Sequence, residues 1–176
     1  PNLGVLPPIV KPKGIDDVPI VTLTFWSDDP AKSGFDLQQI ARAAEIDGIV
    51  TTAYVPSVVA ATALRNLGDK RIKMVGIDDD PIVLDAIKDG YLVGTMAQNP
   101  YGQAYLGSWV LDKIRHGCTV KDGAPFLVDS GTFLITADGA NVGSVPSTAI
   151  ADYVQKRVDI TNELMASFEA SYLNCG

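Results

Sequence analysis

The chain has 176 residues, of which 47% are hydrophobic and 20% are charged, and its formal net charge is −7. These proportions are those of an ordinary globular chain with one domain or two small ones, and they exclude a disordered or low-complexity protein. Binding to nucleic acid or to an anionic membrane requires concentrated positive charge, and the 14 lysines and arginines form no cluster. We therefore expect no nucleic-acid partner. No apolar run approaches the roughly 20 residues of a membrane-spanning helix.

The first 17 residues contain Pro1, Pro7, Pro8 and Pro12, a density that predicts an extended, proline-rich segment rather than a helix. Because the chain begins with Pro1 rather than methionine, we expect a mature or trimmed product. From residue 18 onward, strand-like and helix-like patterns alternate over about a hundred residues. The predicted strands are 18–26, 46–52, 71–77 and 92–97, and the predicted helices are 35–44, a segment opened by Pro56, a segment opened by Pro81, and 101–115.

This alternation predicts an α/β fold, with a doubly wound parallel sheet and helices on its faces. The strands are almost continuously apolar, as expected of strands that are covered on both sides. Two short β-like pieces follow, at 126–128 and 132–136, and a helical pattern returns from Ser147 to Leu173. We divide the chain into a proline-rich segment over 1–17, an α/β lobe over 18–142 and a C-terminal helical tail over 143–176. The tail is expected to pack on its own domain rather than on a partner helix.

The sequence holds no set of residues that is typical of an enzyme. Its single histidine, His116, lies in the last turn of a predicted helix, where positive charge suits the helix dipole, so a Ser-His-Asp or Cys-His site is hard to build. Phosphate-binding glycine loops and zinc motifs are lacking. We predict a binding protein with no catalytic residues, metal or cofactor. Cys118 and Cys175 could form one disulfide in an exported protein or stay free in a cytosol, and both states remain open.

Ligands of open parallel sheets bind beyond the carboxyl ends of the strands, so the residues that follow each strand are the candidate site. Asp78 directly follows strand 71–77, Gln98 follows strand 92–97, and Trp26 and Tyr54 stand at the ends of the other two strands. Carboxylates and amides exchange hydrogen bonds with hydroxyls, and an aromatic ring covers the apolar face of a sugar. The set therefore predicts a sugar or polyol ligand rather than a phosphate or an acid.

Other interpretations of these residues are open. Trp26 could equally be a core residue, Asp79 a solvated turn residue and Asp80 a helix cap. Asn99 and Pro100 could form a simple turn. The acidic pair after strand 18–26, together with Asp78, is similar to the pocket of a phosphoacceptor receiver domain, but the lysine that such a pocket needs is missing from the later strand ends.

Residues 75–107, VGIDDDPIVLDAIKDGYLVGTMAQNPYGQAYLG, resemble the carboxy-terminal lobe of type I periplasmic sugar-binding proteins. These are the ribose-binding-protein-like solute receptors of ABC importers. The shared pattern is a strand that ends in G-[FI]-D, a helix that closes in DG, a strand that ends in A-Q, and a following P and G-x-x-Y-L. The upstream segments IDGIVTTAYVPSVVAATALRNLG and PIVTLTFWSDDP fit the same lobe in order and length, so the resemblance covers roughly residues 18–142.

The resemblance implies that Asp78 and Gln98 bind sugar hydroxyls and that Trp26 or Phe25 supplies an aromatic wall. After IVTT the family commonly has Asn-Asp, whereas this chain has Ala53-Tyr54. The exchange removes one polar contact and adds a tyrosine, which predicts a less hydroxylated or more apolar ligand. By the same resemblance, the partners are a sugar or polyol and the membrane permease of an ABC importer. The expected location is the periplasm, or the cell exterior for a membrane-anchored lipoprotein.

Receptors of this family have two lobes that clamp the ligand, and the sequence contains no recognisable amino-terminal lobe. We expect a missing N-terminal lobe or a second chain to complete the site, because one lobe supplies only half of the contacts. Two alternative functions remain. The chain could be the sugar-sensing effector domain of a LacI-type transcription regulator, which shares the fold and the G-x-D pattern. It could also be an oligomerisation module that uses the tail helix as its contact.

Overall fold

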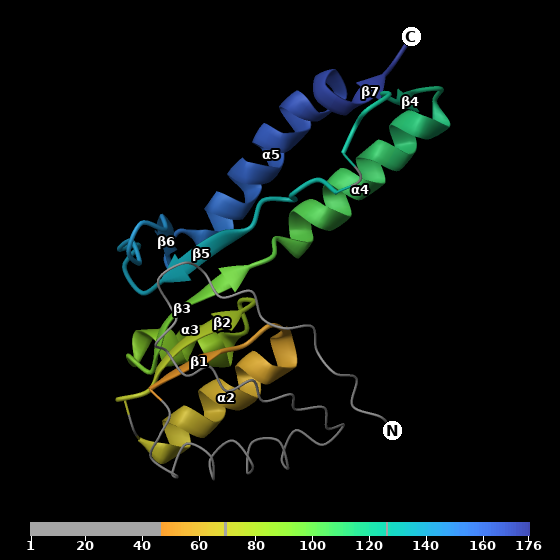
Figure 1. Ribbon diagram of the computed structural model, residues 1–176. Helices are drawn as coiled ribbons and strands as arrows, with labels where there is room; N and C mark the ends of the chain where they lie inside the picture. Colours follow the sequence, from red (N-terminus) through yellow and green to blue (C-terminus); the bar gives the residue numbers. More distant parts are fainter. Residues whose placement is uncertain (1–46, 69, 126) are drawn as a thin grey trace, which may run out of the picture.

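The structure is a computed structural model that describes residues 47–68, 70–125 and 127–176 (Figure 1). The predicted proline-rich segment 1–17, strand 18–26 and helix 35–44 lie outside the described residues. The description therefore begins inside the second predicted strand, 46–52, and covers the remainder of the chain except residues 69 and 126.

A five-stranded sheet forms the centre of the described chain. Three strands pair in parallel in the order β1-β2-β3, and β3 then pairs with β5, which runs antiparallel to it and parallel to β6. The sheet is thus mixed but mostly parallel, and the predicted α/β class is confirmed. The strands are β1 (Gly48–Val50), β2 (Lys73–Ile77), β3 (Leu92–Ala97), β5 (Phe133–Thr136) and β6 (Ser147–Ala149).

Two helices connect the parallel strands and pack against each other on the sheet. Helix α2 (Tyr54–Leu67) joins β1 to β2 and ends at Gly68, whose φ of 67° is the left-handed conformation that a glycine adopts readily. Helix α3 (Pro81–Lys88) joins β2 to β3 and begins with a proline in its first turn. The small side chains on the inner face of α2 allow close packing on the sheet, and this face is made by Ala60, Ala61, Ala63 and Leu64.

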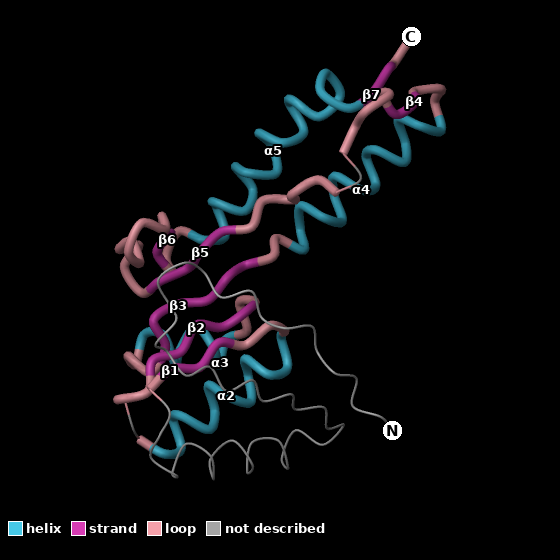
Figure 2. Tube along the Cα trace, in the orientation of Figure 1, coloured by secondary structure: helices cyan, strands magenta, loops and turns pink. Residues whose placement is uncertain are grey.

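The other two helices form a hairpin that projects away from the sheet (Figures 1 and 2). Helix α4 (Pro100–Arg115) packs against α5 (Tyr153–Tyr172). At the far end of the hairpin, β4 (Thr119–Val120) pairs antiparallel with β7 (Leu173–Asn174). Cys118 and Cys175 form a disulfide at this end, which decides between the two states that the sequence left open.

The antiparallel direction of β5 follows from the path of the chain around this hairpin. Helix α4 leads the chain away from β3 to β4 at the far end, and the segments 121–125 and 127–132 lie along the way back to the sheet (Figure 2). On its return, Ser130 lies beside the end of β3, where its hydroxyl donates to the Gln98 carbonyl at 3.3 Å. The chain therefore re-enters the sheet opposite to the direction in which it left, and no parallel crossover is made.

Two predictions in the C-terminal part differ from the structure. The helical pattern predicted from Ser147 begins only at Tyr153, because residues 147–149 form β6 and pair with β5 instead. Leu127 and Val128, from the predicted piece 126–128, lie in the returning loop, and residue 126 is outside the described residues. The predicted division of the chain at residue 142 stays a prediction.

The buried amide of Asn99 joins the sheet to the helical hairpin. Asn99 is fully buried and adopts a left-handed conformation with φ 52°, and its Oδ1 accepts from the Gly102 amide at 3.0 Å as the cap of α4. Its Nδ2 donates to the Ser130 carbonyl at 2.6 Å and to the Thr161 hydroxyl at 3.2 Å. A Cβ at Gly102 would lie 2.2 Å from this Nδ2, so only glycine fits there. The predicted turn at Asn99-Pro100 is therefore also a junction of four segments.

Replacing Asn99 with alanine is expected to lower the free energy of unfolding by about 3 kcal/mol. The substitution leaves the buried partners of the amide without a hydrogen bond and removes the cap of α4. Denaturant unfolding followed by circular dichroism measures the change. Asn99→Asp keeps the acceptor for Gly102 but sets a carboxylate oxygen against the Ser130 carbonyl in a buried site, so it should be at least as destabilising as alanine. Lys156→Ala, at an exposed position of α5, serves as control and should change stability by no more than about 0.5 kcal/mol. An unchanged unfolding midpoint for Asn99→Ala would contradict the assigned role.

Replacing both cysteines with alanine is expected to lower the free energy of unfolding by about 2–4 kcal/mol, because the Cys118–Cys175 bond closes a loop with a sequence separation of 57. Urea unfolding with and without a reductant measures the loss. The reductant should weaken the wild-type chain and leave the double variant unaffected. Equal midpoints for all four samples would show that the bond does not stabilise the fold.

Candidate ligand-binding site

Asp78 stands at the carboxyl end of β2, where the backbone turns sharply. Its φ of 70° is in the left-handed region, which aspartate tolerates better than most residues. Its amide donates to the Met96 carbonyl at 2.8 Å, and its carbonyl accepts from the Thr95 hydroxyl at 2.7 Å. Neighbouring β3 thus fixes the backbone of Asp78 on both sides, and the half-buried side chain remains available at the edge of the sheet.

Gln98 stands at the corresponding place after β3 and reaches the same carboxylate. Its Nε2 donates to Asp78 Oδ1 at 3.0 Å and to Oδ2 at 3.2 Å. Its carbonyl accepts from the Gln103 side chain at 2.8 Å, which holds the start of α4 against the end of the strand. The structure therefore brings the two main predicted site residues together, as the parallel pairing of β2 and β3 requires.

Tyr54 lies at the same edge, at the beginning of α2. Its hydroxyl donates to Asp80 Oδ2, and the ring is about half exposed. The hydrogen bond with the Asp80 carboxylate, helped by the negative charges of Asp80 and its neighbours, raises the pKa of the Tyr54 hydroxyl. Three of the five predicted site residues thus meet at the carboxyl ends of the strands. Trp26 and Phe25 lie outside the described residues.

The hydroxyls of Ser57 and Thr51 form a buried pair next to this edge, and the sequence analysis missed them. Ser57 is fully buried on α2, donates to the Ala53 carbonyl at 2.8 Å and accepts from the Ile77 amide at 2.9 Å. Thr51, which follows β1, lies 2.7 Å from the same hydroxyl. These bonds tie together the ends of β1 and β2 and the first turn of α2. The sequence did offer one signal for this pair, because Ser57 is a hydroxyl residue in the first turn of a helix that follows a strand.

The three consecutive aspartates after β2 have three different partners. Asp80 accepts from the Ile82 amide at 2.8 Å, so its predicted role as the cap of α3 is confirmed. Asp79 was expected to be a solvated turn residue, but it forms an ion pair with Arg157 of α5 at 2.6 Å. Only 22% of the Asp79 side chain and 16% of the Arg157 side chain are exposed. A partner 78 positions away could not be found from the local sequence.

The loop that passes Gln98 on its way back to the sheet is also held in place. Asp129 accepts at one oxygen from the amides of Gly131 and Thr132, at 2.9 and 3.0 Å, and from the Thr132 hydroxyl at 3.1 Å. The backbone donors lower the pKa of the Asp129 carboxyl, because they stabilise its charged form. This turn fixes Ser130 beside Gln98 and Asn99, between the end of β3 and the start of α4.

The described residues contain no group of three or more histidines, cysteines, aspartates or glutamates that could hold a metal ion. Within the same part of the chain, no helix is both long and apolar enough to cross a membrane. His116 is exposed at the end of α4, where its Nδ1 lies 2.8 Å from the Asp112 carbonyl. This is the helix-end position that the sequence predicted for it.

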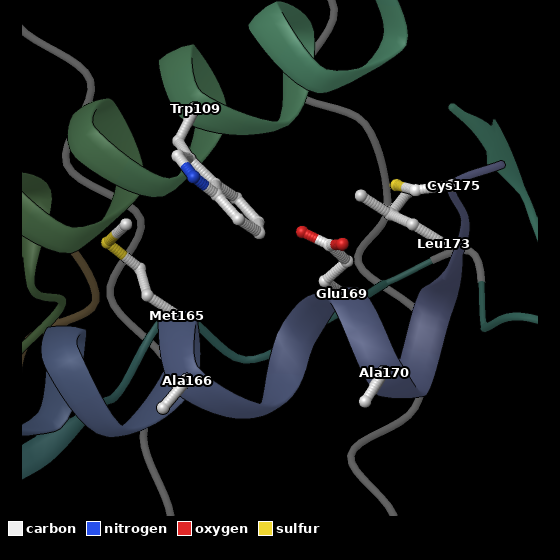
Figure 3. A pocket seen from close by; sticks show the side chains of 7 residues that line it. All are labelled: Trp109, Met165, Ala166, Glu169, Ala170, Leu173 and Cys175. Atoms are coloured by element: carbon white, nitrogen blue, oxygen red, sulfur yellow. The ribbon is translucent and has the colours of Figure 1, made fainter. Parts of the chain in front are cut away.

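An open groove of about 400 Å³ lies between α4 and α5 and does not coincide with the strand ends (Figure 3). Trp109 of α4 faces Met165 and Glu169 of α5, and the groove ends beside Cys175. Of the described residues that were predicted for the site, Asp78, Gln98 and Tyr54, none lines this groove. We therefore keep the edge formed by Asp78, Gln98 and Tyr54 as the candidate ligand-binding site.

The fold resembles that of several solved sugar-binding proteins. A sugar-binding protein of a sugar ABC transporter from Bacillus halodurans has 23% sequence identity and a TM-score of 0.53, with 61% of this chain and 40% of that chain covered. An arabinose-binding protein from Geobacillus stearothermophilus has 25% identity and a TM-score of 0.53, with coverage of 63% and 40%. A solute-binding protein from Agrobacterium vitis, bound with α-D-tagatopyranose, has 22% identity and a TM-score of 0.58, with coverage of 71% and 41%.

The matched region thus spans only about 40% of the length of these solved proteins. A search of curated proteins found no match. The model of the periplasmic binding protein domain matches residues 10–117, which is more than half of the chain and includes Asp78, Gln98 and Tyr54. The chain therefore belongs to the family of the periplasmic binding protein domain.

Proposed function

We propose that the chain provides the ligand-binding sheet edge of a solute-binding protein that delivers a sugar or polyol to an ABC importer. The observation that carries this proposal is the pairing of Asp78 with Gln98 at the carboxyl ends of two parallel strands. Membership of the periplasmic binding protein family and the sugar-binding proteins among the solved neighbours support it.

The chemistry of this edge suits a neutral, hydroxylated ligand. The Asp78 carboxylate accepts hydrogen bonds from hydroxyl groups, and the Gln98 amide orients the carboxylate and offers its own polar atoms to the ligand. The ring of Tyr54 gives an apolar face against which a sugar ring can lie. Binding needs no bond to form or break, so the proposed role of these three residues is recognition without catalysis.

The proposed function requires a second body to complete the site. The matched part of the chain spans about 40% of the neighbouring proteins, and within the described residues Asp78, Gln98 and Tyr54 lie along a single edge of the sheet. A missing N-terminal lobe or a second chain is proposed to close over the ligand, and the membrane permease is the proposed downstream partner. The single edge should bind weakly, because burial from the opposite side supplies a large share of the affinity.

The Cys118–Cys175 disulfide supports a location outside the cytosol. Disulfides form and persist in the periplasm and at the cell exterior, whereas cytosolic reductants keep most thiols reduced. We therefore propose that the protein acts in the periplasm, or at the outer surface of the cell as a membrane-anchored lipoprotein.

A titration of the isotopically labelled chain with monosaccharides and polyols, followed by NMR, tests the proposed function. D-tagatose, D-fucose and D-arabinose, the sugars found with the solved neighbours, form the first panel. At least one should shift the amide signals of residues 77–80 and 95–99, with a dissociation constant on the order of millimolar. No shift in these segments with any sugar or polyol, up to the solubility limit, would overturn the proposal.

The substitution Asp78→Asn is expected to weaken sugar binding at least about tenfold, because a hydrogen bond to a charged acceptor is replaced by a weaker one. Asparagine tolerates the positive φ at this position, so the backbone should be preserved. Asp85→Asn is the matched control, since Asp85 is an exposed carboxylate on α3 that pairs with Lys88 at 3.1 Å. Equal affinities for the wild type and Asp78→Asn would exclude Asp78 from the site.

A further inference from the structure

One side chain of α5 reaches the loop that carries the candidate ligand-binding aspartate. Arg157 Nη2 lies 2.6 Å from Asp79 Oδ2, and both side chains are mostly buried. Asp79 directly follows Asp78, whereas Arg157 lies outside the matched residues 10–117. The contact thus joins the helical hairpin to the candidate site across a separation of 78 positions.

Arg157 is itself held firmly in place. Its guanidinium lies over the ring of Tyr153, 5.4 Å from the ring centre, and its carbonyl accepts from the Thr161 hydroxyl at 2.8 Å. That hydroxyl is the one that Asn99 Nδ2 contacts at 3.2 Å. The helical segment around Arg157 is therefore fixed to the junction at the end of β3, next to Gln98.

The three aspartates of the loop depend on three separate elements for their partners. Asp78 is held by Gln98 after β3, Asp80 by Tyr54 of α2, and Asp79 by Arg157 of α5. The first two contacts come from elements of the sheet and its covering helices, whereas the third comes from the hairpin. Three adjacent carboxylates repel one another, so the cation beside Asp79 also lowers the cost of keeping the loop in this conformation.

We propose that Arg157 is a positioning residue for ligand binding, which acts by pairing with Asp79 and so fixes the carboxylate of Asp78 at the sheet edge. The inference rests on the proposed function and assigns a role in it to the hairpin. Loss of the pair frees the middle of the loop, and the ligand must then order this loop when it binds. Affinity falls, while the residues that would contact the ligand remain unchanged.

The test compares Arg157→Gln, Asp79→Asn and the double variant in NMR titrations with D-tagatose, D-fucose and D-arabinose. Each single variant should bind about three- to tenfold more weakly than the wild type, and the double variant should bind no more weakly than either single one, because all three lose the same pair. Arg157→Lys retains the charge and should recover most of the affinity. This recovery separates the ion pair from a general packing role of the side chain.

The control is Glu169→Gln, which breaks another ion pair of α5, the one with Lys113 in the distal half of the hairpin. It should leave sugar affinity unchanged. Asp79→Asn removes the same ion pair by changing the loop residue instead of the helix residue. It therefore tests the inference even if Arg157→Gln does not fold. Wild-type affinity in a folded Asp79→Asn variant would overturn this inference and leave the proposed function standing. A wild-type chain that binds none of the sugars would overturn both.

Discussion

The placement of the helical hairpin against the sheet depends on the hydrogen bonds of one buried side-chain amide. Asn99 caps α4 through Gly102, and it holds the returning loop and α5 through Ser130 and Thr161. A buried amide is costly unless its polar atoms are paired, so these segments can adopt few other relative positions. Because Asn99 follows Gln98 directly, the junction that orients the hairpin also fixes one side of the candidate site.

The candidate site shows how a parallel sheet brings distant residues together without a dedicated loop. Asp78 and Gln98 are 20 positions apart, yet the pairing of β2 with β3 places their side chains within hydrogen-bond distance. Arg157 pairs with Asp79, and Tyr54 donates a hydrogen bond to Asp80, so each carboxylate of the triplet has a partner. Within the described residues only Asp79 faces a cation, whereas Asp78 and Asp80 bond to the neutral groups of Gln98 and Tyr54, so the edge keeps a negative charge that would repel an anionic ligand.

The hairpin differs from the sheet in how much of its surface is covered. The inner faces of α2 and α3 are fully buried on the sheet, whereas α4 packs mainly on α5 and leaves Tyr105 about 50% and Leu111 about 70% exposed. The aromatic contacts of Trp109 and Tyr172 with Phe168 and the distal disulfide stabilise this thin pair of helices. The same hairpin reverses the direction of the chain, which is why β5 enters the sheet antiparallel to β3.

Local patterns in the sequence were sufficient for the α/β class, for the cap at Asp80 and for the positions of Asp78 and Gln98. Strand and helix periodicity, together with proline and glycine signals, report on neighbours within a few residues, and in a parallel sheet the strand ends are then known to share one edge. The burial of Ser57, the disulfide, the direction of β5 and the pairing of Asp79 with Arg157 came only from the folded chain. Each of these joins segments that are distant in sequence, and a local pattern shows that a residue is polar or apolar without showing which distant group it meets.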